Sequence, residues 1–167
     1  LGFNDPRVFS NYAIILNDIG KKKEAAILLR KAIKLKPDFA SAYCNLGTIL
    51  NDLGKSLEAE MFLGKAIQLE PDCADYHSNF GTILKNIGKL KEAEYHTRKA
   101  IEIKPDFAKA HSNLGWILKE TGERKEARFH LLKAIELNPK LELANFMLAQ
   151  QLYYEGNYEE AINYLKD

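Results

Sequence analysis

The sequence repeats itself every 34 residues, and this period constrains the fold more than any other feature. Proline recurs at this interval at Pro37, Pro71, Pro105 and Pro139. Glycine does so at Gly20, Gly54, Gly88, Gly122 and Gly156. Small residues recur in two further registers, at Ala25, Ala59, Ala93, Ala127 and Ala161, and at Ala32, Ala66, Ala100 and Ala134. Self-similarity at such a period is the signature of stacked supersecondary units.

Each period is predicted to contain two amphipathic helices. The segment Ala40–Leu53 places apolar and small residues at helical spacing, at Tyr43, Leu46, Gly47 and Leu50. Gly54 ends this helix by allowing a left-handed residue. The segment Ser56–Leu69 carries Ala59, Leu63, Ala66 and Ile67 on one face. The Pro71-Asp72 step closes it, because a residue before proline avoids the α region.

Aspartates follow the repeated prolines at Asp38, Asp72 and Asp106. Aspartate is a preferred N-cap, so each is expected to cap the helix that follows. Small residues at Gly47 and Ala59 are expected to let the two helices of one hairpin approach closely.

The pattern Tyr43-x-x-Leu46-Gly47-x-x-Leu50, followed by Ala59, Leu63, Ala66 and Pro71, resembles the tetratricopeptide repeat. The resemblance implies an all-α fold, a right-handed α-solenoid of antiparallel helix hairpins. It implies one array over residues 1–167, with repeats at 6–39, 40–73, 74–107 and 108–141 and a partial repeat at 142–167. The first helix of each hairpin is then expected to line a concave groove, and the second to line the convex back. Tyr158, Ile162 and Leu165 are expected to be partly exposed.

Charge and cysteine content narrow the function classes. The 167 residues carry a formal net charge of +1, which argues against a broad electrostatic grip on nucleic acid or on an anionic membrane. No apolar run approaches the roughly 20 residues that span a bilayer. The two cysteines, Cys44 and Cys73, form neither a metal-ligand motif nor a disulfide framework. We therefore expect free thiols in a reducing, cytoplasmic compartment.

Catalytic chemistry is not indicated by any motif. His77 and His111 are one period apart, as are His96 and His130, so the four histidines look like duplicated sequence and a structural role is expected. There is no zinc-protease motif, paired-cysteine motif or phosphate-binding glycine loop. We predict that the chain is not an enzyme and uses no cofactor or metal.

Asparagine recurs once in each of the first four repeats, in what we call the asparagine row: Asn11, Asn45, Asn79 and Asn113. Adjacent helices lie about 8–10 Å apart and an extended peptide advances about 3.3 Å per residue. Each amide could thus meet a peptide backbone at about every third residue. The row resembles the asparagine ladder of the O-linked N-acetylglucosamine transferases, which grips extended substrates. The alternative is that these amides hold neighbouring helices together.

Two further rows are expected to line the groove. The threonine row holds Ile14, Thr48, Thr82 and Trp116, and the lysine row holds Asn17, Asn51, Lys85, Lys119 and Tyr153. Lys109 lies in a third row with Arg7, Ser41 and Asp75. Towards the C-terminus, Trp116, Phe146, Tyr153 and Tyr154 are expected either to form an apolar pocket or to pack against a following repeat.

The leading hypothesis is a module that binds an extended peptide or partner protein in its groove. One alternative is the substrate-recruiting arm of a transferase or hydroxylase whose catalytic domain lies outside this chain. Another is a scaffold that self-associates end to end through its terminal helices. A carboxylate clamp for chaperone tails is incomplete, because Ser10, Ile14 and Asn113 stand where basic residues are needed.

Overall fold

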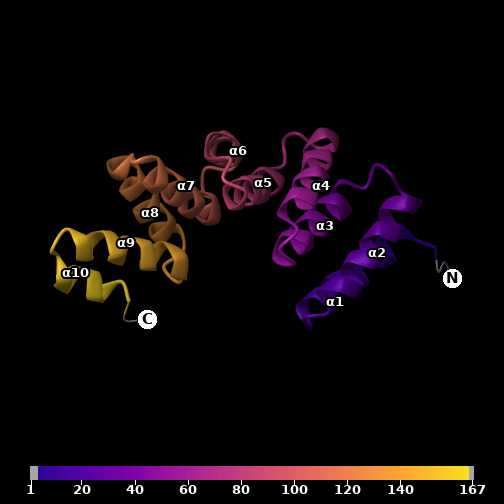
Figure 1. The fold of residues 1–167 in the computed structure, drawn as a ribbon, viewed down its shortest axis with the longest axis horizontal. Coiled ribbons are helices and arrows are strands. Elements are labelled where there is room, and N and C mark those ends of the chain that lie inside the picture. Colours follow the sequence, from indigo (N-terminus) through magenta and orange to yellow (C-terminus); the bar gives the residue numbers. More distant parts are fainter. Residues whose placement is uncertain (1–3, 166–167) are drawn as a thin grey trace. The chain divides into compact units, whose positions relative to one another are not determined.

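The computed structural model describes residues 4–165, which are entirely helical apart from turns. The helices are α1 (Pro6–Asp18), α2 (Lys22–Leu35), α3 (Ala40–Asp52), α4 (Ser56–Leu69), α5 (Ala74–Asn86), α6 (Leu90–Ile103), α7 (Ala108–Thr121), α8 (Arg124–Leu137), α9 (Glu142–Tyr154) and α10 (Tyr158–Asn163) (Figure 1). The all-α prediction is confirmed. The last two residues of the predicted fifth repeat, 166–167, lie outside the described residues.

The chain divides into two compact units between Lys89 and Leu90. In the first unit, α1 pairs with α2 and α3 pairs with α4, and each second helix packs on the next first helix, α2 on α3 and α4 on α5. The first helices α1, α3 and α5 also contact one another in sequence order. The unit therefore has a layer of first helices and a layer of second helices.

The second unit follows the same plan. Here α6 packs on α7, the α7/α8 and α9/α10 pairs form hairpins, and α8 packs on α9. The first helices α7 and α9 contact each other. One hairpin cannot bury its own apolar face, so stacking of neighbours creates the core of each unit.

Glycine ends the first helices as predicted. Gly54 has φ +76° and Gly122 has φ +93°, in the left-handed region that disfavours other residues. The N–H of the next residue, Lys55, then bonds back to Leu50 O at 2.9 Å, which satisfies a carbonyl that the helix end leaves unpaired.

The predicted aspartate caps are wrong. The N-cap residues of α3, α5 and α7 are Phe39, Cys73 and Phe107, and no side chain caps these helices. The Pro-Asp pair instead forms a turn that ends before the helix begins. Asp5, at the place that Phe39 holds one period later, does cap α1 and accepts a bond from Arg7 N at 2.8 Å.

Small residues set the spacing within each hairpin. A Cβ added to Gly47 would lie 2.1 Å from Leu63 Cδ1 and 3.2 Å from Ala59 O, so α3 and α4 approach to a distance that only glycine permits there. Ala59 and Leu63 are fully buried at this crossing. The expected close approach is confirmed.

Candidate functional site

The asparagine row becomes more buried along the chain. Asn11 is exposed on α1, Asn45 and Asn79 are half-buried on α3 and α5, and Asn113 on α7 is only 4% exposed. The Asn79 amide Nδ2 donates to Cys44 Sγ at 3.5 Å, a contact between neighbouring first helices. Burial also raises the pKa of the Cys44 thiol, which keeps it protonated. The amides of this row thus differ in how far a guest chain can reach them.

The threonine row remains accessible. Ile14 and Thr48 are exposed, and Thr82 and Trp116 are half-buried. The two threonine hydroxyls donate to carbonyls of their own helices, Thr48 Oγ1 to Cys44 O at 3.0 Å and Thr82 Oγ1 to Ser78 O at 3.1 Å. A hydroxyl that donates in this way retains acceptor capacity.

The lysine row links neighbouring first helices by hydrogen bonds. In the first unit, Asn51 Oδ1 on α3 accepts from Asn86 Nδ2 on α5 at 3.0 Å. In the second unit, Lys119 Nζ on α7 donates to Gln150 Oε1 on α9. Lys85 is half-buried, and burial lowers the pKa of its ammonium group. This row therefore stiffens each layer of first helices.

The predicted groove residues thus fall into two groups. Asn11, Asn45, Asn79, Thr48, Thr82 and Lys85 lie in the first unit, while Lys109, Asn113, Trp116, Lys119 and Tyr153 lie in the second. Lys109 and Tyr153 are exposed. Within each unit these side chains occupy first helices that lie against one another.

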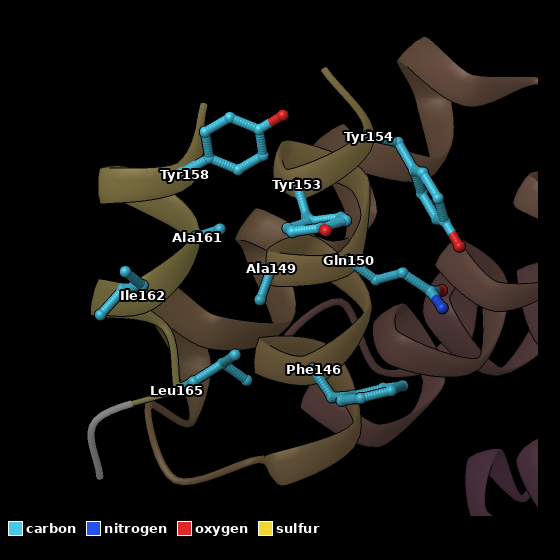
Figure 2. Close-up of a pocket in the computed structure, with 9 residues that line it drawn as sticks. All are labelled: Phe146, Ala149, Gln150, Tyr153, Tyr154, Tyr158, Ala161, Ile162 and Leu165. Atoms are coloured by element: carbon cyan, nitrogen blue, oxygen red, sulfur yellow. The ribbon is translucent and has the colours of Figure 1, made fainter. Parts of the chain in front are cut away.

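An apolar groove of about 350 Å³ lies between α9 and α10 (Figure 2). Phe146 and Tyr153 of α9 and Tyr158 and Ile162 of α10 are among its lining residues. Of the four aromatic residues expected to cluster near the C-terminus, Phe146, Tyr153 and Tyr154 line this groove, whereas Trp116 does not belong to it. Trp116 packs instead against a buried cluster with Leu131, Ala134, Ala144 and Met147, because it lies one repeat earlier and is covered by the next hairpin.

A histidine pair was missed by the sequence analysis. His111 and His130 stack within the α7/α8 hairpin with ring centroids 5.1 Å apart, and they are 5% and 8% exposed. In the α3/α4 hairpin, Tyr43 and Phe62 hold the same repeat places with centroids 6.2 Å apart. A comparison of these two places between repeats would have revealed the pairing. Within residues 4–165, no three histidine, cysteine or carboxylate side chains gather as metal ligands would.

Family sequence models support the repeat assignment. Models described as tetratricopeptide repeats match residues 40–73, 74–107 and 108–141, and a further TPR repeat model matches residues 14–54. These matches cover most of the chain. The chain belongs to the tetratricopeptide repeat family. Members of this family are protein-interaction modules and are in general not catalytic.

Solved tetratricopeptide repeat proteins share the fold at low sequence identity. MamA is 23% identical with a TM-score of 0.77, and the match covers 92% of this chain and 90% of that one. PilF of Pseudomonas aeruginosa is 22% identical with a TM-score of 0.86, covering 95% and 72%. YrrB, described as a TPR protein with an unusual peptide-binding site, is 23% identical with a TM-score of 0.72, covering 97% and 84%. At these identities the likeness establishes an α-solenoid fold alone.

No curated protein sequence matches this chain significantly. Among the helices of residues 4–165, none has both the length and the apolar content that crossing a bilayer would require.

Proposed function

We propose that this tetratricopeptide repeat protein binds an extended segment of a partner protein along its layers of first helices. The supporting observation is the contrast between neighbouring rows. Leucines that directly neighbour the asparagine and lysine rows in the sequence are fully buried, namely Leu46, Leu50 and Leu114. Thr48 and Lys109, in contrast, stay exposed. A surface that is accessible, regularly spaced and held by cross-helix hydrogen bonds is preorganised for a guest chain.

The residues nearest to such a guest are those that the structure leaves reachable. In the first unit these are Asn11 on α1 and both Asn45 and Thr48 on α3, the first helix that lies between α1 and α5. An amide offers a donor and an acceptor to a peptide group without reading its side chain. Each net hydrogen bond contributes about 0.5–1.5 kcal/mol, so a few such contacts support roughly micromolar affinity. The description of YrrB as peptide-binding is consistent with this use of the fold.

The near-neutral charge favours a protein partner over nucleic acid, since +1 gives no extended field for phosphates. Cys44 and Cys73 are both free thiols, and we place the protein in a reducing compartment such as the cytoplasm for that reason.

Selection from a random peptide display library, followed by fluorescence anisotropy, tests the proposal. We expect enriched peptides to bind the wild-type chain and to lose about tenfold in affinity, about 1.4 kcal/mol, with Thr48→Arg, which adds bulk to an exposed place on α3. The matched control is Met61→Arg on α4, where the wild-type side chain is 76% exposed. Equal binding by Thr48→Arg and wild type, or loss with Met61→Arg alone, would refute a site on the first helices.

A further inference from the structure

An apolar stripe runs along the exposed side of α1. Val8, Tyr12, Ile15 and Ile19 are 54%, 54%, 57% and 63% exposed. One period later, on α3 and at its C-cap, the same places hold Ala42, Leu46, Ile49 and Leu53, of which the first three are at most 5% exposed. They are buried because α3 packs onto the α1/α2 hairpin. The stripe is therefore the face with which a first helix packs on a preceding hairpin.

The groove between α9 and α10 is the complementary surface, because it is the side of a hairpin on which a following first helix packs. Phe146 and Leu165 line it and are 56% and 59% exposed. In the α1/α2 hairpin, their counterparts Ser10 and Leu29 are 3% and 0% exposed, since α3 fills the corresponding space. Figure 2 shows Tyr158, Ile162 and Leu165 on one side of the groove and Phe146 and Tyr153 on α9 opposite.

We propose that the α9/α10 groove of one molecule binds α1 of a second copy, so that the repeat packing continues from molecule to molecule. The contacts between hairpins inside the chain fix the register of this interface. Adding or subtracting whole periods of 34 residues gives the equivalent of each contact at the interface, with one residue in the groove and the other on α1 of the second copy.

The first such contact joins Arg128 Nη1 of α8 to Oε2 of Glu155, the C-cap of α9, at 2.9 Å. One period after Arg128 comes Ile162, and four periods before Glu155 comes Ile19. The ion pair inside the chain is thus replaced at the interface by two isoleucines, which are 51% and 63% exposed. Burying both removes apolar surface from water, which favours association.

The second contact joins Lys119 on α7 to Gln150 on α9. The equivalent pair at the interface is Tyr153 with Ile14 of the second copy, and these side chains are 60% and 45% exposed. Here too a polar pair inside the chain corresponds to an apolar pair at the interface.

The third contact joins Lys22 Nζ on α2 to Asp52 Oδ2 on α3 at 2.8 Å. Its equivalent at the interface is Tyr158 with Asp18 of the second copy. A phenol hydroxyl can donate to a carboxylate, so this pair is chemically matched although it differs from the original. These three contacts convert into compatible pairs, whereas the Asn79–Cys44 bond between first helices converts into Asn11 with Phe146.

Such an interface joins two different surfaces, and it generates open chains of molecules unless the rotation closes a ring. Sedimentation velocity across a dilution series, from micromolar to millimolar, should show a mass that rises with concentration. Ile19→Asp and Ile162→Asp should each hold the protein close to the monomer. Neither residue belongs to the rows proposed to bind peptide, so this result is independent of peptide binding.

Ile27→Asp on α2 is the matched control, because Ile27 is 63% exposed, like Ile19, but lies outside the stripe. It should leave the mass profile unchanged. Mixing the Ile19→Asp and Ile162→Asp variants should give a one-to-one dimer, since each retains one intact surface. In one chain, Ile162→Arg with Ile19→Glu should restore association by recreating the Arg128–Glu155 pair.

Three results would overturn the proposal. They are a wild-type monomer at every concentration, an Ile27→Asp variant that dissociates as far as Ile19→Asp, and an equimolar mixture of the two interface variants that stays monomeric.

Discussion

Nδ1 of His111 on α7 lies 2.9 Å from Nδ1 of His130 on α8. His111 Nε2 is also 3.0 Å from Pro105 O, and a carbonyl only accepts, so the proton of neutral His111 is on Nε2. His130 Nδ1 must then donate to His111 Nδ1. His130 Nε2 lies 3.7 Å from Glu126 Oε1. The α7/α8 hairpin is therefore built around two histidine rings joined by a hydrogen bond.

The lowered pKa of buried His130 predicts that stability falls as the solution becomes acidic. Burial, and then the proximity of His111 and Arg98, lower the pKa of His130, while Glu126 opposes the shift. Below the ordinary histidine pKa of about 6.5 the unfolded chain binds a proton that native His130 resists, so stability rises with pH in this window. The slope from one such group is at most about 1.4 kcal/mol per pH unit. Urea unfolding at pH values from about 7 to 5 measures it.

The control for this prediction is the double variant His111→Tyr with His130→Phe, which installs the Tyr43–Phe62 pair of the α3/α4 hairpin. It should unfold with a shallower dependence on pH over the same window. An unchanged slope would show that the pH dependence arises elsewhere in the chain.

Much of the fold was predictable because it depends on local and periodic signals. The helix Ser56–Leu69 was predicted with the bounds that the structure has. Gly54 was predicted to be left-handed and is. Each signal rests on backbone geometry within a few residues, and the period repeats it along the chain.

The candidate site was less predictable, because burial depends on contacts between hairpins. Asn45 and Asn113 are the same residue at the same repeat place, yet one is half-buried and the other is 4% exposed. The Asp72 cap failed for a related reason, since the turn after Pro71 sets where α5 begins. The place of a side chain in the repeat does not fix what covers it.

Gly64→Ala should stabilise the protein by about 0.5–1 kcal/mol, because alanine costs less backbone entropy than glycine in a helix. Gly64 lies inside α4, and an added Cβ would have no atom within 4 Å. Gly54→Ala is the comparison, since its Cβ would be equally unobstructed but its φ is +76°. This variant should lose about 1–2 kcal/mol. A similar thermal shift for both would contradict the assignment of backbone strain.

Gly47→Ala should destabilise the protein by roughly 1–3 kcal/mol through overpacking. Its Cβ would displace Leu63, which is fully buried, and would press on Ala59 O, so α3 must move away from α4. Ala13 holds this place in the α1/α2 hairpin, which shows that helices can separate enough to accept a methyl group. Adding Leu63→Val should recover part of the loss, and a double-mutant cycle of urea unfolding measures this coupling. Strict additivity would argue against a direct clash.

Asn113→Ala and Asn45→Ala should differ in effect although the two residues hold the same place in successive repeats. Asn113 is 4% exposed, and removing a buried amide leaves the polar groups around it unpaired, at a cost of about 1–3 kcal/mol. Asn45 is half-buried and its truncation should cost less than about 0.5 kcal/mol, as at most surface sites. Conversely, Asn45→Ala should weaken a selected peptide while Asn113→Ala leaves its affinity unchanged. Urea unfolding and fluorescence anisotropy on the same two variants measure both effects. Equal losses of stability would show that Asn113 is as accessible as Asn45 in solution, and the division between packing and reachable amides would then be wrong.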